Sequence, residues 1–166
     1  TFGSALANNL VADISAASTK DGAKAQLYTS NNTLAQMFRV KYMNDGTYTS
    51  YALHSNKPLD VSGATLAIGT AIQQYTSNNT KAQRWVIEKN SDNTYSLISV
   101  ATGHAIHLKG NAATSSARLV AGIRSASKAQ RFIPAQVTSY LQDGIYTLQS
   151  KLDTNFVVDI AGASTK

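Results

Sequence analysis

Short segments in which apolar and polar residues alternate or cluster over four or five positions recur along the chain. Alternation places successive side chains on opposite faces of a sheet, so the pattern predicts β-strands. No run of about ten residues has apolar positions at helical spacing, although residues 34–38 could form a single turn. The expected strands in the middle of the chain are residues 47–51, 58–61, 71–75 and 83–87.

These segments belong to a repeat of 47 residues. The sequence Thr-Ser-Asn-Asn-Thr occurs at residues 29–33 and again at residues 76–80, each time followed by an Ala-Gln pair. The same offset relates further pairs of residues: Asp13 and Asp60, Gly22 and Gly69, Gln26 and Gln73, Tyr28 and Tyr75, Gln36 and Gln83, and Phe38 and Trp85. So many matches at one offset indicate an internal duplication.

A third copy keeps the Ala-Gln-Arg sequence of residues 82–84 at residues 129–131. Its polar positions have changed. His107, Val120 and Gly122 stand where the second copy has Asp60, Gln73 and Tyr75. We therefore divide the chain into repeats 1–46, 47–93 and 94–142.

Four short strands in each of three repeats indicate an all-β architecture with threefold pseudosymmetry. A β-trefoil with three repeats of about 47 residues fits this pattern. A β-propeller also has four strands per repeat, but three blades are fewer than the usual minimum of four. We expect residues 1–142 to form the β-trefoil.

Residues 143–166 look like the beginning of a fourth copy. After an insertion near residues 139–142, residues 158–166 closely repeat residues 12–20, with Asp159 in the place of Asp13. This segment could start a further repeat or the next trefoil, or it could exchange with the matching N-terminal segment of another copy. A neighbouring trefoil and a domain-swapped copy are therefore both candidate partners.

The 166 residues include 15 Lys and Arg against 9 Asp and Glu, which gives a net charge of +6. A basic chain suggests nucleic acid as a partner, but these basic residues stand singly rather than in the clusters that phosphate binding needs. We expect no nucleic-acid binding. No segment approaches the roughly 18 apolar residues of a membrane span, so we also expect no membrane insertion.

The chain contains no cysteine, which excludes disulfides and thiolate metal sites. Its histidines lack the spacing that metal sites show, and we predict neither a metal nor a cofactor. An enzyme needs a unique pair of catalytic groups, whereas each candidate acid here recurs with the repeat. We predict a non-enzymatic domain with no catalytic residues, and any catalysis would belong to another domain of a longer chain.

The repeats resemble the ricin B-type lectins and related carbohydrate-binding β-trefoils. The resemblance rests on a Gln-x-aromatic sequence that ends each repeat, at residues 36–38, 83–85 and 130–132, preceded in the first two repeats by Asp13 and Asp60. It covers residues 1–142, and residues 143–166 as a partial repeat. It implies a lectin-like module of a larger secreted or cell-surface protein, of bacterial origin, that binds galactose-type or other hexoses weakly at two sites.

The family places an Asp and an aromatic residue about fifteen positions later in one shallow sugar pocket, and both intact repeats keep this spacing. The acid would accept hydroxyl protons, the tyrosine would stack on the sugar ring, and the glutamines would orient or support the acid. The expected carbohydrate-binding residues are Asp13, Gln26, Tyr28 and Gln36, and Asp60, Gln73, Tyr75 and Gln83. Ala35 and Ala82 stand where galactose binders of the family often have Asn, so the resemblance does not fix the sugar.

Structural roles for the same residues stay open. Asp13 and Asp60 could satisfy backbone amides of turns, and the two tyrosines could pack on the sheet surface. The glutamine that ends each repeat is expected to be structural, because the third repeat keeps Gln130 although it has no stacking residue. Phe38, Trp85 and Phe132 are expected in the core. The alternative function is a structural or protein-interaction spacer, as in an adhesin, that binds no sugar.

Overall fold

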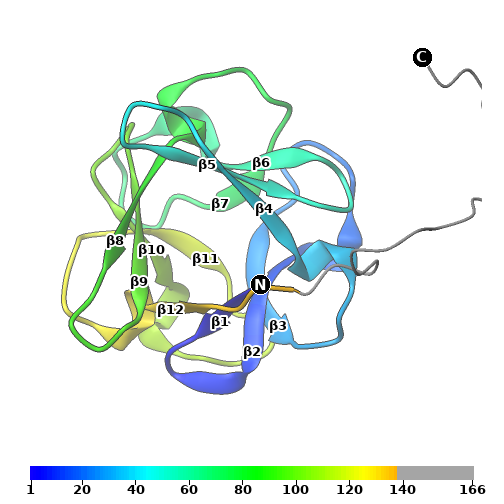
Figure 1. Ribbon diagram of the computed structural model, residues 1–166, viewed down its shortest axis with the longest axis vertical. Coiled ribbons are helices and arrows are strands. Elements are labelled where there is room, and N and C mark those ends of the chain that lie inside the picture. Colours follow the sequence, from blue (N-terminus) through cyan, green and yellow to red (C-terminus); the bar gives the residue numbers. More distant parts are fainter. Residues whose placement is uncertain (138–166) are drawn as a thin grey trace, which may run out of the picture.

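The computed structural model describes residues 1–137. The expected domain boundary at residue 142 and the three interpretations of residues 143–166 lie outside these residues. The described chain is all-β, with antiparallel strands and single turns of 3₁₀ helix, and its three repeats surround the centre of the molecule (Figure 1).

Six strands form a barrel. Neighbouring strands pair antiparallel in the order β4, β5, β8, β9, β12 and β1. These strands are β1 (Phe2–Ser4), β4 (Phe38–Tyr42), β5 (Tyr48–Ala52), β8 (Trp85–Lys89), β9 (Tyr95–Ser99) and β12 (Phe132–Pro134). Each repeat therefore contributes two strands to the barrel.

Each repeat also contributes a hairpin that joins the barrel on one side. The hairpins are β2 (Ala7–Ile14) with β3 (Ala25–Thr29), β6 (Lys57–Val61) with β7 (Ile72–Gln74), and β10 (Ala105–Leu108) with β11 (Leu119–Gly122). Equivalent residues face each other in all three: Asp13 and Gln26, Asp60 and Gln73, His107 and Val120. The 47-residue repeat is thus a repeat of strand register as well as of sequence.

The core lies between the barrel and the hairpins and is filled from equivalent positions. Ile14, Val61 and Leu108, the last residues of β2, β6 and β10, are at most 1% exposed. Trp85 and Phe132 are buried as expected, and the indole nitrogen of Trp85 donates a hydrogen bond to the carbonyl oxygen of Leu59 (3.2 Å).

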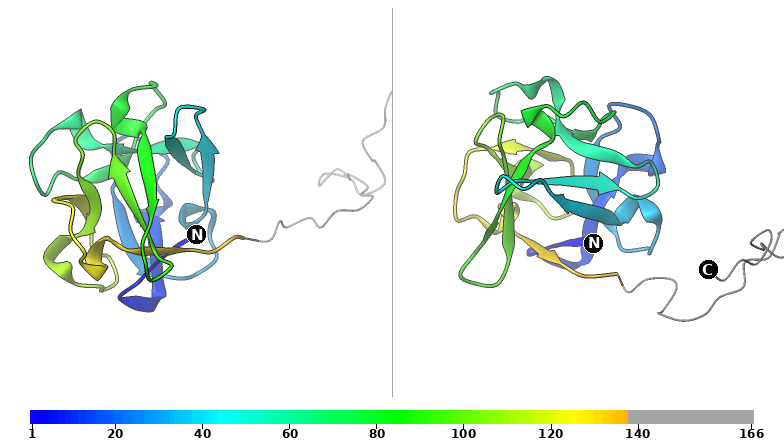
Figure 2. Two further views of the ribbon diagram at one scale, coloured as in Figure 1. Left: turned by 60° about the vertical axis from the view of Figure 1, so that its left-hand side comes forward. Right: turned by 45° about the horizontal axis from the view of Figure 1, so that its top comes forward.

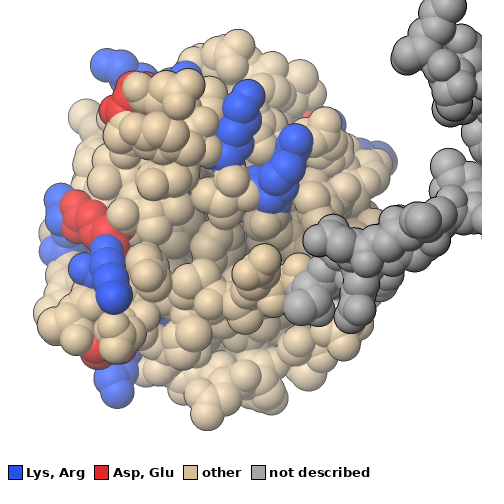
Figure 3. Space-filling model, in the orientation of Figure 1, with Lys and Arg blue, Asp and Glu red and all other residues tan. Residues whose placement is uncertain are grey.

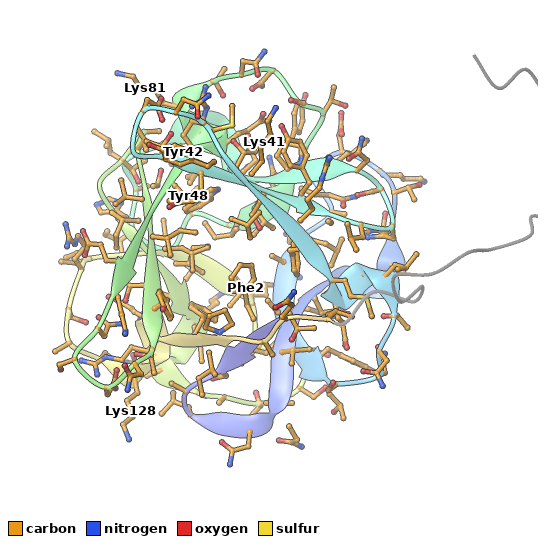
Figure 4. The ribbon with its side chains drawn as sticks, viewed as in Figure 1. Phe2, Lys41, Tyr42, Tyr48, Lys81 and Lys128 are labelled. Atoms are coloured by element: carbon orange, nitrogen blue, oxygen red, sulfur yellow. The ribbon has the colours of Figure 1, made fainter. Side chains whose placement is uncertain are left out.

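Phe38 is only half-buried, because the junction between β1 and β4 differs from its equivalents. In the second repeat Tyr48 pairs with Trp85, and the residue equivalent to Tyr48 in the first repeat is Thr1. The N-terminus lies beside the end of β12 instead (Figure 2). There the Thr1 amino group donates to the carbonyl oxygen of Ala135 (2.8 Å). Phe2 points into the barrel (Figure 4) and its ring contacts that of Phe38, with centroids 5.8 Å apart. Side-chain packing, rather than a ladder, therefore closes the barrel here.

A single turn of 3₁₀ helix precedes the last strand of each repeat: η2 (Leu34–Gln36), η4 (Lys81–Gln83) and η6 (Lys128–Gln130). The turn expected within residues 34–38 is confirmed. The strand expected at residues 83–87 begins instead at Trp85, because Gln83 ends the turn.

The glutamine of each turn is buried and bonds to the backbone of the preceding loop. Gln83 Oε1 accepts from the Asn78 N–H (3.0 Å), and Gln83 Nε2 donates to the Thr76 carbonyl oxygen (2.9 Å). Gln36 and Gln130 make the same pair of bonds in their own repeats. This side chain therefore fixes the loop after each hairpin, which supports the structural role expected for it.

The three hairpins interlock through a second loop. In the first repeat, the Gly22 N–H donates to the Gln74 carbonyl oxygen (3.0 Å) and the Gln74 N–H to that of Ala23 (2.8 Å). The loop of each repeat thus forms backbone hydrogen bonds with a hairpin strand of another repeat. The loop of the first repeat pairs with β7, that of the second with β11 and that of the third with β3. Residues of one repeat consequently lie beside the hairpin of another.

Replacing Gln83 with Leu should lower the free energy of unfolding by about 2 kcal/mol, because it removes a buried amide and both of its partly buried hydrogen bonds to the loop. Urea unfolding measures the change. Gln136→Leu, at an exposed position, is the matched control and should change stability by less than about 0.5 kcal/mol. Equal effects of the two substitutions would contradict the structural role.

Candidate functional site

The register of the hairpins places the expected site residues on one face. Asp13 lies opposite Gln26 and Val11 lies opposite Tyr28, so three of the four candidate residues of the first repeat project from the same side of β2 and β3. In the second repeat Asp60 lies opposite Gln73, and Tyr75 follows two positions later. Strand geometry alone therefore brings the acid, the amide and the tyrosine together.

Each of these two hairpin faces borders a pocket. The pocket of the first repeat has a volume of about 400 Å³, and that of the second about 470 Å³. Equivalent residues line both: Asp13 and Asp60, Ser15 and Ser62, Ala16 and Gly63, Ala17 and Ala64, Gln26 and Gln73, Tyr28 and Tyr75, Asn31 and Asn78, Thr33 and Thr80, and Ala35 and Ala82. The pockets are shallow, open and matched position by position.

The acid forms the buried floor of each pocket. Asp13 and Asp60 are both 5% exposed, and each accepts a hydrogen bond from the paired glutamine, Gln26 or Gln73, at 3.0 Å. Burial raises the pKa of both carboxyl groups, and the glutamine amides partly oppose this effect. Each carboxylate keeps free lone pairs that could accept hydroxyl protons from a ligand.

The tyrosine forms an exposed wall. Tyr28 is 39% exposed and Tyr75 is 40% exposed, so part of each ring is available for stacking. The opposite rim is polar: in the second repeat, Asn78 Oδ1 accepts from the Thr80 N–H and hydroxyl, and Asn31 and Thr33 repeat this arrangement. A ring with one apolar face and hydroxyls around its edge would meet complementary groups.

Gln36 and Gln83 lie behind the pockets rather than in their walls. Both are buried, and Gln83 Nε2 lies 3.3 Å from Asp60 Oδ2. The structure therefore places them where they hold the loop and support the acid. Ala35 and Ala82, one position earlier, do line the pockets, so a methyl group stands where an Asn would present an amide.

The third repeat has no equivalent pocket among the described residues. Gln130 Nε2 lies 3.3 Å from His107 Nδ1, so the imidazole replaces the carboxylate as a partner of the glutamine. Burial lowers the pKa of His107, which favours the neutral ring. A Cβ added to Gly122 would lie 2.7 Å from His107 Cβ, which leaves no room for a stacking side chain.

A model of the ricin-type β-trefoil lectin domain-like family matches residues 4–75, 36–122 and 81–166. The chain belongs to this family. A search of curated proteins found no match.

Solved structures place this ricin-type domain among β-trefoils. A designed threefold symmetric protein, ThreeFoil, is 25% identical with a TM-score of 0.79, over 82% of this chain and 96% of that one. A mosquitocidal holotoxin is 22% identical with a TM-score of 0.76, over 94% of this chain but only 19% of the toxin. The ricin B-like lectin of Macrolepiota procera, solved with lactose, is 17% identical with a TM-score of 0.69, over 80% and 91% of the two chains.

The pockets of this ricin-type domain contain residues that the sequence pattern did not single out. Ser15, Asn31 and Thr33 line the first pocket, and Ser62, Asn78 and Thr80 line the second. The repeated Thr-Ser-Asn-Asn-Thr sequence was a signal for the asparagine and threonine, because identical loops follow both candidate hairpins. Ser116, from the third repeat, carried no such signal.

Residues 1–137 contain no group of three or more His, Asp or Glu side chains arranged to hold a metal ion. None of the helical segments in this range is both long and apolar enough to cross a membrane.

Asp13→Asn should leave the domain at least as stable as the parent at pH 7. The raised pKa means that the folded state holds its proton to higher pH than the unfolded chain, so ionisation of Asp13 as pH rises above the ordinary value of 3.8 costs stability. Asn keeps the acceptor for Gln26 without the charge. Well below pH 3.8 the parent is protonated in both states and the difference should vanish.

Thermal unfolding of parent and variant at pH 7 and near pH 3 measures this effect. The new amide would also face Gln36, just as an amide in place of the Asp60 carboxylate would face Gln83 Nε2. A loss of more than about 1 kcal/mol for Asp13→Asn at pH 7 would show that the carboxylate is needed for folding instead.

Gly122→Ala should destabilise the domain by about 1–3 kcal/mol, because the new methyl group overlaps His107 Cβ. A double-mutant cycle with His107→Gly measures the contact: Gly122→Ala should cost clearly less in the His107→Gly background. An equal loss of stability in both backgrounds would mean that the His107 side chain does not fill the space beside Gly122.

Proposed function

We propose that this domain binds carbohydrate without catalysing a reaction, at the two pockets that contain Asp13 and Tyr28, and Asp60 and Tyr75. The observation that carries the proposal is the match between the pockets: the acid, the glutamine, the exposed tyrosine and the polar rim recur together on two hairpins. The third hairpin has His107, Val120 and Gly122 in place of the acid, the glutamine and the tyrosine. Repetition of one complete set favours binding of one class of ligand at two places.

The chemistry of each pocket fits a pyranose. The tyrosine ring would stack on the face of C–H groups, and the buried carboxylate would accept protons from two neighbouring hydroxyls. Asn and Thr at the rim would contact the remaining hydroxyls. The lectin of Macrolepiota procera, with the same fold, binds lactose, which supports a sugar ligand here and leaves open which hexose is preferred.

A binding role is also favoured over catalysis and over nucleic-acid recognition. Glycosidases need two carboxyl groups about 5–10 Å apart, whereas the described lining of each pocket includes one Asp. On the face in Figure 3, basic side chains lie at separate places, some beside acidic ones. Ion pairs such as Arg84–Asp45 (3.1 Å) and Arg124–Glu88 (2.5 Å) occupy part of the positive charge.

Both pockets are shallow, so each site alone should bind weakly. Linkage to neighbouring units would raise the apparent affinity through effective concentration. We therefore place the domain in a larger extracellular or cell-surface protein, where a linked trefoil or an exchanged copy would supply further sites.

Tyr28→Ala and Tyr75→Ala should each weaken binding at their own pocket by about tenfold, and the double variant should lose most binding. A glycan array identifies the sugar, and calorimetric titration with that sugar measures affinity and stoichiometry. Tyr42→Ala is the matched control, because Tyr42 is 51% exposed and lies on β4, outside both pockets (Figure 4).

The parent protein should bind two sugar molecules per chain and each single tyrosine variant about one. Failure of the parent protein to bind any glycan on the array at high concentration would contradict the proposal and favour a spacer that holds other domains apart.

A further inference from the structure

Among the differences between the two pockets, one wall position comes from another repeat. Ser116 lines the first pocket although it belongs to the third repeat. Its loop lies against β3: the Ser116 N–H donates to the Leu27 carbonyl oxygen, and the Leu27 N–H donates to that of Ala117, both at 2.7 Å. This backbone pairing holds Ser116 beside Asp13 and Tyr28.

Gly22 holds the equivalent position at the second pocket. Its loop pairs with β7, and a Cβ on Gly22 would lie 3.8 Å from Gln73 Oε1, so the position faces the second pocket but has no side chain there. The third equivalent, Gly69, bonds to Ala121 on β11 and has no atom within 4 Å of an added Cβ. Only the first pocket therefore receives a side chain from this loop position.

The backbone at all three positions is left-handed, with φ of 78° at Gly22, 87° at Gly69 and 67° at Ser116. Glycine adopts this conformation freely, whereas serine does so at a cost of about 1 kcal/mol. Ser116 is exposed, so burial of its side chain does not offset this cost. An unfavourable conformation beside a pocket motivates a functional explanation.

The neighbouring residue makes the pockets differ further. Asp21 precedes Gly22 and bonds to Lys57 Nζ (2.5 Å) and to the Thr76 hydroxyl (2.9 Å), so an ion pair lies next to the second pocket. The corresponding residue at the first pocket is Ser115. Hydroxyl groups thus stand at one pocket where a charged pair stands at the other.

We propose that Ser116 determines the specificity of the first pocket, where its hydroxyl bonds to a hydroxyl of the bound saccharide, so that the two pockets of one chain prefer different sugars. The inference rests on the proposed sugar binding. It also gives the divergent third repeat a role, since that repeat has no equivalent pocket on its described hairpin but supplies a wall of the first.

The test isolates each pocket with the tyrosine variants. In the Tyr75→Ala background only the first pocket binds. There Ser116→Ala should lower the affinity for the preferred sugar among galactose, glucose, mannose and lactose by about threefold to tenfold. Ser116→Gly should lower this affinity equally while leaving stability unchanged or higher, because glycine relieves the backbone strain. Titration of each sugar gives the affinities, and thermal unfolding gives the stability.

The reciprocal change is Gly22→Ser in the Tyr28→Ala background, which reports the second pocket. Its sugar preference should shift toward that of the first pocket. Gly69→Ser is the matched control: it introduces the same backbone strain at the hairpin without a pocket, and should lower stability without changing either preference.

The outcomes separate the two proposals. Unchanged affinities on Ser116→Ala, with sugar still bound in the Tyr75→Ala background, would overturn the role of Ser116 and leave the proposed function standing. Equal sugar preferences of the two isolated pockets would also overturn it. Absence of binding by the parent protein would overturn both.

Discussion

The buried glutamine that ends each 3₁₀ turn fixes the loop after its hairpin. Gln36, Gln83 and Gln130 are buried, and each accepts from a loop N–H and donates to a loop carbonyl oxygen. The same loops carry the polar rims of the two pockets. Because the third repeat keeps its glutamine without the acid and the tyrosine, these bonds serve the fold whether or not that set of residues is present.

The acid of each pocket, unlike the glutamine, is not needed for the fold. Burial raises the pKa of Asp13 and Asp60, so an ionised carboxylate is less favourable in these positions than in water. The third repeat has replaced this acid with His107 and still forms its hairpin with the same register. A group that the fold can replace, placed beside an exposed tyrosine, is best explained by contact with a ligand.

Much of the fold followed from the repeat, because each repeat imposes the same strand register and the same core positions, as at Ile14, Val61 and Leu108. Two details did not. Phe38 is less buried than Trp85 because Thr1 bonds beside β12, so β4 pairs with β5 but has no strand partner on its β1 side, and this depends on contacts across the whole barrel. The spacing of acid and tyrosine predicted residues that meet within one hairpin, but Ser116 reaches its pocket through pairing between repeats, and spacing within a repeat carries no information about it.

The central claim is that two hairpins, and not the third, bind sugar through a buried acid and an exposed tyrosine. Titration of isotopically labelled protein with the best glycan from the array, followed by NMR of the backbone amides, tests this claim most directly. The account predicts perturbed amides around β2–β3 and β6–β7, with those of β10–β11 unchanged apart from the loop of Ser116. Perturbations centred on β10–β11, or spread over the barrel without the two pockets, would contradict it.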